Sequence, residues 1–376
     1  MDSEQKRLDF TVTLQQNNSH ARSALLTTRR GDEIECPVFM PVGTLATVKA
    51  MDPDEVAQLG FKIILANTYH LMLRPGSEIV SDHGGLHSFM GWNHSILTDS
   101  GGYQVFSLAH RRKITEQGVS FRNHLNGDLA ELTPEKAIAI QEDLGSDIMM
   151  VLDECPPHDS SHEYMRNSVE RTTRWAQRCL HARTQRGGAL FAIVQGGLDI
   201  EMRLEHLEKL ATMGFDGMAI GGLSVGEGPE AMDAVLSRVA HLLPEDRPRY
   251  LMGVGLPQDI IRAVGHGVDM FDCVVPTRNA RNGQLYTWDG PIQIRHAVHA
   301  KDTSPVDETC DCPACTRFSK AYLRHLYISD EILGVRLNTI HNLNFYARLM
   351  KKIREKIRSG TFDNWSISAL ERLERA

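Results

Sequence analysis

The sequence predicts a (β/α)8 TIM barrel of the α/β class. With 376 residues and 41% apolar content, the chain can bury a large core, as one α/β domain or two smaller ones. Eight short and nearly continuous apolar runs alternate with helix-like segments, which is typical of a parallel sheet buried on both faces. Eight such runs favour a closed barrel over an open sheet.

The eight predicted strands follow one another along the whole chain. Amphipathic segments between several of them predict the outer helices, because their apolar residues recur at helical spacing. These helix candidates span 53–60, 133–145, 163–180, 199–214, 229–243 and 257–267. The strand candidates span 36–43, 62–68, 95–102, 147–155, 190–197, 217–223, 249–255 and 270–278.

Three segments do not fit the simple repeat. Residues 110–128, HRRKITEQGVSFRNHLNGD, predict an insertion with short strands of its own. The runs LDFTVTLQQ and ARSALLTT alternate like a hairpin, at about residues 8–30, that could cap the barrel. We expect one domain over residues 1–376, with a subdomain inserted at about residues 301–350 whose cysteine run CDCPAC indicates zinc binding.

Polar or glycine residues stand at the carboxyl ends of the predicted strands. In a barrel these ends form the mouth where active sites lie. A single aspartate at such a position can be explained as a cap of the next helix, but six strand ends together favour a site. The residues are Asp99-Ser100-Gly101-Gly102, Asp153-Glu154, Gln195-Gly196-Gly197, Gly221-Gly222, Gly253 and Asp272.

The run CDCPAC predicts a structural zinc site. Cys310, Cys312 and Cys315 are three soft ligands in one loop, and His341 would complete a closed Cys3His set. His325 competes with His341 for the fourth place on spacing, whereas Asp311 is a poorer ligand than imidazole. Such a site leaves no open position for water, so the catalytic chemistry should lie elsewhere.

The mouth offers groups that suit guanine. A carboxylate such as Asp153 can accept from the N1–H and exocyclic amine, while Gln195 and glycine N–H groups can donate to O6 and N7. Tyr103 and Met252 could sandwich the flat ring, although for Met252 a core position is the default interpretation. The sequence thus indicates a base-binding pocket.

Asp272 then fits as a nucleophile. Cleavage of an N-glycosidic bond passes through an oxocarbenium-like state, which a carboxylate can trap as a covalent ester. Arg278 and Arg281 could reach the flanking phosphates, although a solvated loop is the usual role of such a pair. The sequence therefore predicts that the substrate is a nucleotide within a polynucleotide.

Composition restricts the environment and the partners. A net charge of -7 argues against indiscriminate polyanion binding, but it leaves room for a local basic site. No run reaches eighteen apolar residues and no signal-peptide pattern opens the chain, so we expect an unexported protein without a membrane partner. Seven cysteines, an odd number, fit a reducing cytoplasm better than a disulfide framework.

The motifs resemble those of the queuine/preQ1 tRNA-ribosyltransferases, the tRNA-guanine transglycosylases. They include TDSGGYQVFSL, GSDIMMVLDEC, VQGG, AIGGLSVGE, YLMGVG, DMFDCVVPTRNARNG, TCDCPACTR and NTIHNL, and extend from about Phe10 to Phe362. The resemblance implies a zinc-bearing barrel, often a homodimer, that exchanges guanine at the wobble position of tRNA through a covalent intermediate.

The resemblance also implies roles for individual residues. Asp272 would be the nucleophile and Asp99 the general acid/base that also reads the base. Zinc would bind Cys310, Cys312, Cys315 and His341. The base would contact Ser100, Gly101, Gly102, Tyr103, Asp153, Gln195, Gly222, Leu223 and Met252. The RNA would contact Gly253, Val254, Gly255, Leu256, Pro257, Gln258 and Asp259, then Thr277, Arg278, Asn279, Ala280 and Arg281.

The same resemblance bears on the incoming base. Val225 and Cys155 are similar to the bacterial form, which inserts preQ1 into tRNAs with a GUN anticodon (Asp, Asn, His and Tyr) during queuosine biosynthesis. A branched valine should crowd the larger ring of queuine. We expect preQ1 as the incoming base, with queuine as the alternative. We do not expect archaeosine synthesis, because the sequence shows no match to the extra C-terminal RNA-binding domains of archaeal relatives.

Two other functions compete with that of a tRNA-modifying enzyme. A non-catalytic accessory subunit would lack the catalytic aspartates, but Asp99 and Asp272 are both present. A metal-dependent barrel hydrolase would need metal ligands at the strand ends, where no histidine accompanies the carboxylates. Basic residues beside the zinc loop and in RLMKKIREKIR (348–358) could contact RNA, but the latter segment could equally be a solvated helix face or a dimer surface.

Overall fold

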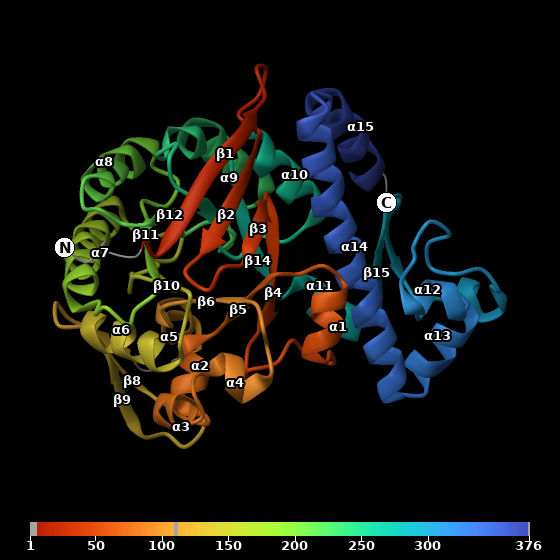
Figure 1. Ribbon diagram of the computed structural model, residues 1–376, viewed down its shortest axis with the longest axis horizontal. Coiled ribbons are helices and arrows are strands. Elements are labelled where there is room, and N and C mark those ends of the chain that lie inside the picture. The colour runs from red at the N-terminus through yellow and green to blue at the C-terminus, as the bar shows by residue number, and fades with distance from the viewer. Residues whose placement is uncertain (1–5, 109–111, 375–376) are drawn as a thin grey trace.

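The eight predicted strands form one closed parallel barrel in the computed structural model, which describes residues 6–108 and 112–374 (Figure 1). The strands follow one another around the barrel in chain order, and the last pairs with the first, with Phe271 opposite Phe39. The predicted (β/α)8 fold is confirmed. The strands are β4 (Val38–Gly43), β5 (Ile63–Ala66), β6 (Ser95–Thr98), β10 (Ile148–Met150), β11 (Ala189–Val194), β12 (Gly217–Ile220), β13 (Arg249–Leu251) and β14 (Met270–Cys273).

Helices surround the barrel, and each of the six amphipathic segments contains one. Local signals define where several begin: before α6, for example, the Thr133 hydroxyl accepts from Lys136 N and a proline follows at the first helical position. The helices are α1 (Pro53–Gln58), α2 (Thr68–Leu73), α3 (Ser77–Asp82), α4 (Leu86–Met90), α5 (Gly102–Leu108), α6 (Pro134–Asp143), α7 (His162–Ala182), α8 (Ile200–Ala211), α9 (Pro229–Val239), the 3-10 turn η1 (Ala240–Leu242), α10 (Pro257–Gly265) and α11 (Val275–Arg281).

The barrel strands are buried on both faces. Every residue of β5, β10, β11 and β12 is buried, which explains why these strands have continuous apolar sequences. Packing between neighbouring strands is close: a Cβ added at Gly217 would lie 2.5 Å from the ring of Phe191. The core therefore holds the strand ends rigidly in place.

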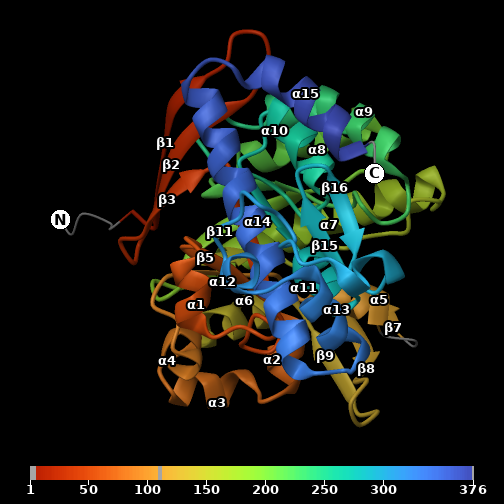
Figure 2. The same cartoon turned by 90° about the vertical axis from the view of Figure 1, so that its right-hand side faces the viewer.

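An antiparallel sheet of β1 (Leu8–Gln15), β2 (Arg22–Thr28) and β3 (Glu33–Cys36) covers the amino-terminal end of the barrel. Arg22 forms a fully buried ion pair with Asp269, which immediately precedes β14, and also donates to the carbonyls of Glu245 and Arg247 before β13. Figure 2 shows this sheet at the left of the barrel and α5, which follows β6, at the right. The mouth therefore remains uncovered by this sheet.

The predicted insertion after β6 forms a small antiparallel sheet. It consists of β7 (Arg112–Ile114), β8 (Val119–Arg122) and β9 (Leu129–Leu132), and leads into α6. Residues 109–111, at its start, lie outside the described residues.

The C-terminal elements include the last outer helix of the barrel. The long helix α14 contacts β4, α10 and α11 on one side and β15, α12 and α13 on the other, so the intervening segment projects away from the barrel (Figure 1). None of the helices in the described ranges combines the length and hydropathy needed to cross a membrane. The elements are β15 (Gln284–Thr287), β16 (Gly290–Gln293), the 3-10 turn η2 (Ala297–Lys301), α12 (Pro313–Arg317), α13 (Lys320–Ile328), α14 (Ile332–Arg358) and α15 (Phe362–Glu374).

The basic segment at the end of α14 forms ion pairs within the chain. Arg348 pairs with Asp307, while Arg354 and Arg358 both approach Glu35. These pairs attach α14 to the metal-loop segment and to β3. The arginines therefore have an intramolecular role.

Candidate active site

A cavity of about 460 Å³ opens at the carboxyl ends of the barrel strands. Most of the residues predicted to bind base or RNA line it, namely Asp99, Ser100, Gly101, Tyr103, Asp153, Gln195, Gly222, Leu223, Met252, Gly253, Gly255, Leu256, Asp259, Asp272 and Arg278. The other predicted residues are not part of its lining: Gly102, Val254, Pro257, Gln258, Thr277, Asn279, Ala280 and Arg281. Barrel closure thus collects side chains that are far apart in the sequence.

Asp272 is held rigidly at the end of β14. Its Oδ1 accepts from the Tyr250 hydroxyl at 2.5 Å and from the Gly253 N–H at 2.8 Å. Burial raises the pKa of Asp272, while these two donors oppose that rise. Both donors bind the same oxygen, so Oδ2 is the oxygen that can react with a ligand in the cavity.

Asp99 follows β6 and is buried among hydrogen-bond donors. Its oxygens accept from Asn67 Nδ2 at 2.5 Å, Gln104 Nε2 at 2.8 Å and the N–H groups of Thr68 and Gly101. Burial raises the pKa of Asp99 to about 6 despite these donors, and the negative charge of Asp272 adds to the rise. This carboxyl can therefore exchange a proton near neutral pH.

Asp153 and Gln195 form a second polar pair on the neighbouring strands β10 and β11. Gln195 Nε2 donates to Asp153 Oδ2 at 2.6 Å, and burial raises the pKa of Asp153 to about 6. Gln195 Oε1 is buried without a hydrogen-bond partner among the described residues. The pair presents both donors and acceptors to a planar ligand.

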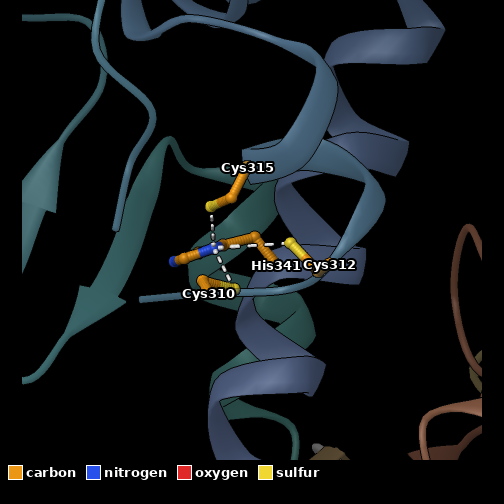
Figure 3. Close-up of side chains that lie close together, drawn as sticks. All are labelled: Cys310, Cys312, Cys315 and His341. Carbon is orange, nitrogen blue, oxygen red and sulfur yellow. Dashed lines mark hydrogen bonds between the residues drawn. The ribbon is translucent and has the colours of Figure 1, made fainter. Parts of the chain in front are cut away.

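The metal-binding group lies outside the cavity, on the C-terminal segment (Figure 3). The thiol groups of Cys310, Cys312 and Cys315 surround His341 Nδ1 at 3.8, 3.8 and 3.3 Å. In a tetrahedral zinc site with ordinary bond lengths, sulfur and nitrogen ligands lie ~3.5 Å apart, so the four side chains fit such an ion. His341 Nε2 donates to the Tyr286 carbonyl at 2.8 Å, which leaves Nδ1 free to bind the metal.

The rival ligands do not join this group. His325 is exposed on α13 and Asp311 is exposed beside the loop, whereas the four members are all buried. Among the residues that the structure describes, these four are the one cluster of His, Cys, Asp or Glu suited to a metal ion. None of the four members lines the cavity.

The comparison with known proteins decides the family. The family model for queuine tRNA-ribosyltransferase matches residues 17–375. The chain is 54% identical to the queuine tRNA-ribosyltransferase of Solidesulfovibrio magneticus, over 94% of this chain and 95% of that protein. It is 52% identical to the one of Bacillus licheniformis, over 99% and 97% of the two chains. The chain belongs to the queuine tRNA-ribosyltransferase family.

In this member of the queuine tRNA-ribosyltransferase family, the two predicted stacking residues differ in their surroundings. Tyr103 is the second residue of α5 and is 52% exposed, so its ring is free to cover a ligand. Met252 is partly buried against the core but also lines the cavity. The core interpretation of Met252 is therefore only half correct.

The predicted RNA segments of this ribosyltransferase-family chain present mostly backbone and arginine. Val254, Pro257 and Asp259 are buried, so in residues 253–259 the exposed groups are Gly253 and Leu256. In α11, Arg278 is exposed. The pKa of Arg281 is lowered, mainly by the partial burial of its own guanidinium and secondly by the positive charge of Arg278. Two neighbouring guanidiniums repel each other unless an anion binds between them.

Sequence reasoning missed several groups of the family site. Asn67 and Gln104 donate to Asp99, and Tyr250 donates to Asp272. Glu227 accepts from the N–H groups of Ser224 and Val225 and so shapes the loop after β12. Asn67 follows the apolar run of β5, so the strand-end criterion could have found it; Tyr250 lies within a strand and carries no such signal.

Proposed function

We propose that the protein exchanges guanine at the wobble position of GUN-anticodon tRNAs (Asp, Asn, His and Tyr) for preQ1, in queuosine biosynthesis. The observation that carries this proposal is the pairing of Asp272, oriented through Oδ1, with Asp99, a carboxyl of pKa about 6, in one cavity. One carboxylate suits a nucleophile and the other a proton carrier.

The chemistry proceeds by two displacements at C1′ of the ribose. Asp272 Oδ2 forms an ester bond to C1′ while the bond to guanine N9 breaks, and the electron pair goes to the base. Asp99 supplies the proton that neutralises the departing guanine, and then accepts a proton from the incoming base as that base attacks C1′ and releases Asp272. Two inversions keep the β configuration, and the RNA backbone stays intact.

Recognition of the base falls to the polar groups on the neighbouring strands. Asp153 accepts from the N1–H and amine of guanine, while Gln195 and the Gly222 N–H donate to its oxygen. Tyr103 covers one face of the ring and Met252 the other. Arg278 and Arg281 bind phosphates beside the wobble nucleotide, and the exposed backbone at Gly253 lines the same cavity as Arg278.

We expect the incoming base to be preQ1, because the branched side chain of Val225 should crowd the larger ring of queuine. Val225 lines the cavity and its N–H is bound to Glu227 at 2.8 Å, so the side chain cannot easily retreat. Queuine is the alternative substrate if the loop moves.

The remaining properties follow from the resemblance and from the metal group. Zinc binds Cys310, Cys312, Cys315 and His341 and stabilises the C-terminal segment, without a role in catalysis. We expect one structural domain with an N-terminal cap, acting as a homodimer in the cytoplasm. No disulfide bond links any of the seven cysteines, all of which lie in the described ranges.

The test is base exchange on an unmodified tRNA transcript carrying labelled guanine, chased in parallel with preQ1 and queuine. Release of the labelled guanine with preQ1 but not with queuine supports both the reaction and the exclusion of queuine by Val225. Release with queuine as efficient as with preQ1 overturns the assignment of the incoming base. No release with either favours a non-catalytic accessory subunit.

A further inference from the structure

Arg203 is a fully buried arginine on α8 that the reaction described above does not use. Its Nε donates to the Gly197 carbonyl at 2.7 Å and its Nη1 to the Val194 carbonyl at 3.1 Å, both at the end of β11. Its Nη2 donates to the Gly221 carbonyl at 2.9 Å and reaches the Gly222 carbonyl at 3.5 Å, at the end of β12. One guanidinium therefore joins two of the strand ends that face the cavity.

The orientation of the Gly221–Gly222 peptide follows from this contact. In a trans peptide the C=O and the N–H point in opposite directions, so a Gly221 carbonyl bound to Arg203 directs the Gly222 N–H away from Arg203. That N–H lies close enough to the Cys155 thiol to oppose the pKa rise caused by burial, and Cys155 lines the cavity. The donor is thus aimed at the ligand side.

The other strand end is held in the same way. A second α8 side chain, His206, accepts from the Gln195 N–H at 3.0 Å through Nδ1. A Cβ added at Gly196 would lie 2.7 Å from Arg203 Cγ, so the loop rests directly on the arginine stem. Gln195, which carries the amide facing the cavity, is therefore fixed by the two side chains.

We propose that Arg203 is a positioning residue for base recognition, which orients the Gly222 N–H and the Gln195 amide toward the heterocycle. This inference rests on the proposed function. The planar fork of the guanidinium is essential, because its separate N–H groups reach carbonyls of both strand ends at once. An ammonium in its place is a compact donor that cannot span the same acceptors.

The test compares Arg203→Lys with the wild type in the base-exchange assay. Misplacing two donors to the base should raise the KM for preQ1 about tenfold or more, while the KM for tRNA, which depends on phosphate contacts, changes less than about twofold. The matched control is Arg249→Lys. Arg249 is also buried and donates to backbone carbonyls, at Leu243 and His241, but at the opposite end of the barrel.

The control separates positioning from general destabilisation. Both variants should lower the melting temperature, but Arg249→Lys should leave the KM for preQ1 within about twofold of wild type. If the KM for preQ1 rises in both variants, or in neither, the positioning role of Arg203 is overturned. If Arg203→Lys does not fold, Arg203→Gln is the second variant: its single amide group cannot reach the carbonyls of both strand ends, so the KM for preQ1 should again rise about tenfold. An unchanged KM in that variant then overturns the assignment.

The two levels of the proposal fail in different ways. Absence of exchange by the wild-type protein contradicts the proposed function itself. Normal exchange by the wild type, with an unchanged KM for preQ1 in Arg203→Lys, contradicts only the positioning role.

Discussion

The Tyr250 hydroxyl donates a hydrogen bond of 2.5 Å to Asp272 Oδ1. The two residues come from the adjacent strands β13 and β14, where Tyr250 is fully buried and Asp272 faces the cavity. The bond holds one carboxylate oxygen and leaves the other for the sugar, and it favours the charged form of the nucleophile.

Replacing Tyr250 by Phe should therefore slow catalysis without abolishing it. Loss of one hydrogen bond to a charged acceptor should reduce the rate of covalent adduct formation about tenfold or more. The pKa of Asp272 should rise further, so the variant should lose activity at a higher pH than the wild type as the solution is acidified. A single-turnover pH profile tests this, and an unshifted acid limb would contradict the role of the hydroxyl.

Asp272→Asn should eliminate the covalent adduct while the protein stays folded. The asparagine keeps the acceptor for Tyr250 but is not a nucleophile. The measurement is denaturing gel electrophoresis after incubation with tRNA, with the melting temperature as a check on folding. An adduct that persists in this variant would assign the nucleophile to another carboxylate, with Asp99 the first candidate.

Asp153→Asn should stabilise the protein above pH 6 and impair base exchange. Burial raises the pKa of Asp153 to about 6, so the folded state binds its proton more tightly than the unfolded chain does. The charged carboxyl thus opposes folding fully above pH 6, and this effect disappears as the pH falls from about 6 to about 4.

Thermal unfolding at pH 8 and pH 4 checks the stability prediction for Asp153→Asn. The variant should be more stable than wild type by on the order of 2 kcal/mol at pH 8, and equal to it at pH 4. Its KM for preQ1 should rise, since the acceptor for the N1–H is lost. If the variant is less stable than wild type at pH 8, the hydrogen bonds to the Asp153 carboxylate stabilise its charge by more than burial destabilises it, and the prediction is wrong.

Val225→Gly should admit queuine. Removing the branched side chain from the cavity wall should raise kcat/KM for queuine about tenfold or more, because the loss of its methyl groups leaves room for a larger base. Turnover with preQ1, assayed in parallel, should change less than about threefold. Equal queuine activity before and after the substitution would remove Val225 from the selectivity argument.

Cys312→Ser should release the metal and lower thermal stability. The thiol is one of four buried ligands, and the remaining three cannot complete a tetrahedral shell. Metal analysis of the purified protein should show less than one zinc per chain. His325→Ala is the matched control, since this exposed histidine was the rival ligand; it should retain a full metal content.

Much of this structure follows from local sequence patterns. The eight apolar runs became barrel strands because strands covered on both faces have few polar positions, and burial of β11 and β12 is complete. Asp99, Asp153 and Asp272 could be proposed as site residues because each interrupts or ends such a run. The Cys3His set was readable because three of its ligands are local in the chain.

Other features depend on tertiary contacts alone. Arg203 has the sequence context of a solvated residue on an amphipathic helix, yet it is fully buried beneath two glycine loops. Tyr250 resembles any core aromatic until β14 pairs beside β13 and places a carboxylate against its hydroxyl. The choice of His341 over His325 was decided by where α14 passes the cysteine loop.

By itself, then, the sequence determined the barrel, its mouth, the acidic groups and the three metal-binding cysteines. These are properties of local periodicity and residue type. Only the tertiary structure decided which donors bind each carboxylate, and hence which oxygen of Asp272 is free. Burial in the tertiary structure also raises the pKa values of Asp99 and Asp153 to about 6. The reason is physical: closing the barrel brings distant strand ends together and removes them from water, and both distance and solvation set the electrostatics of the site.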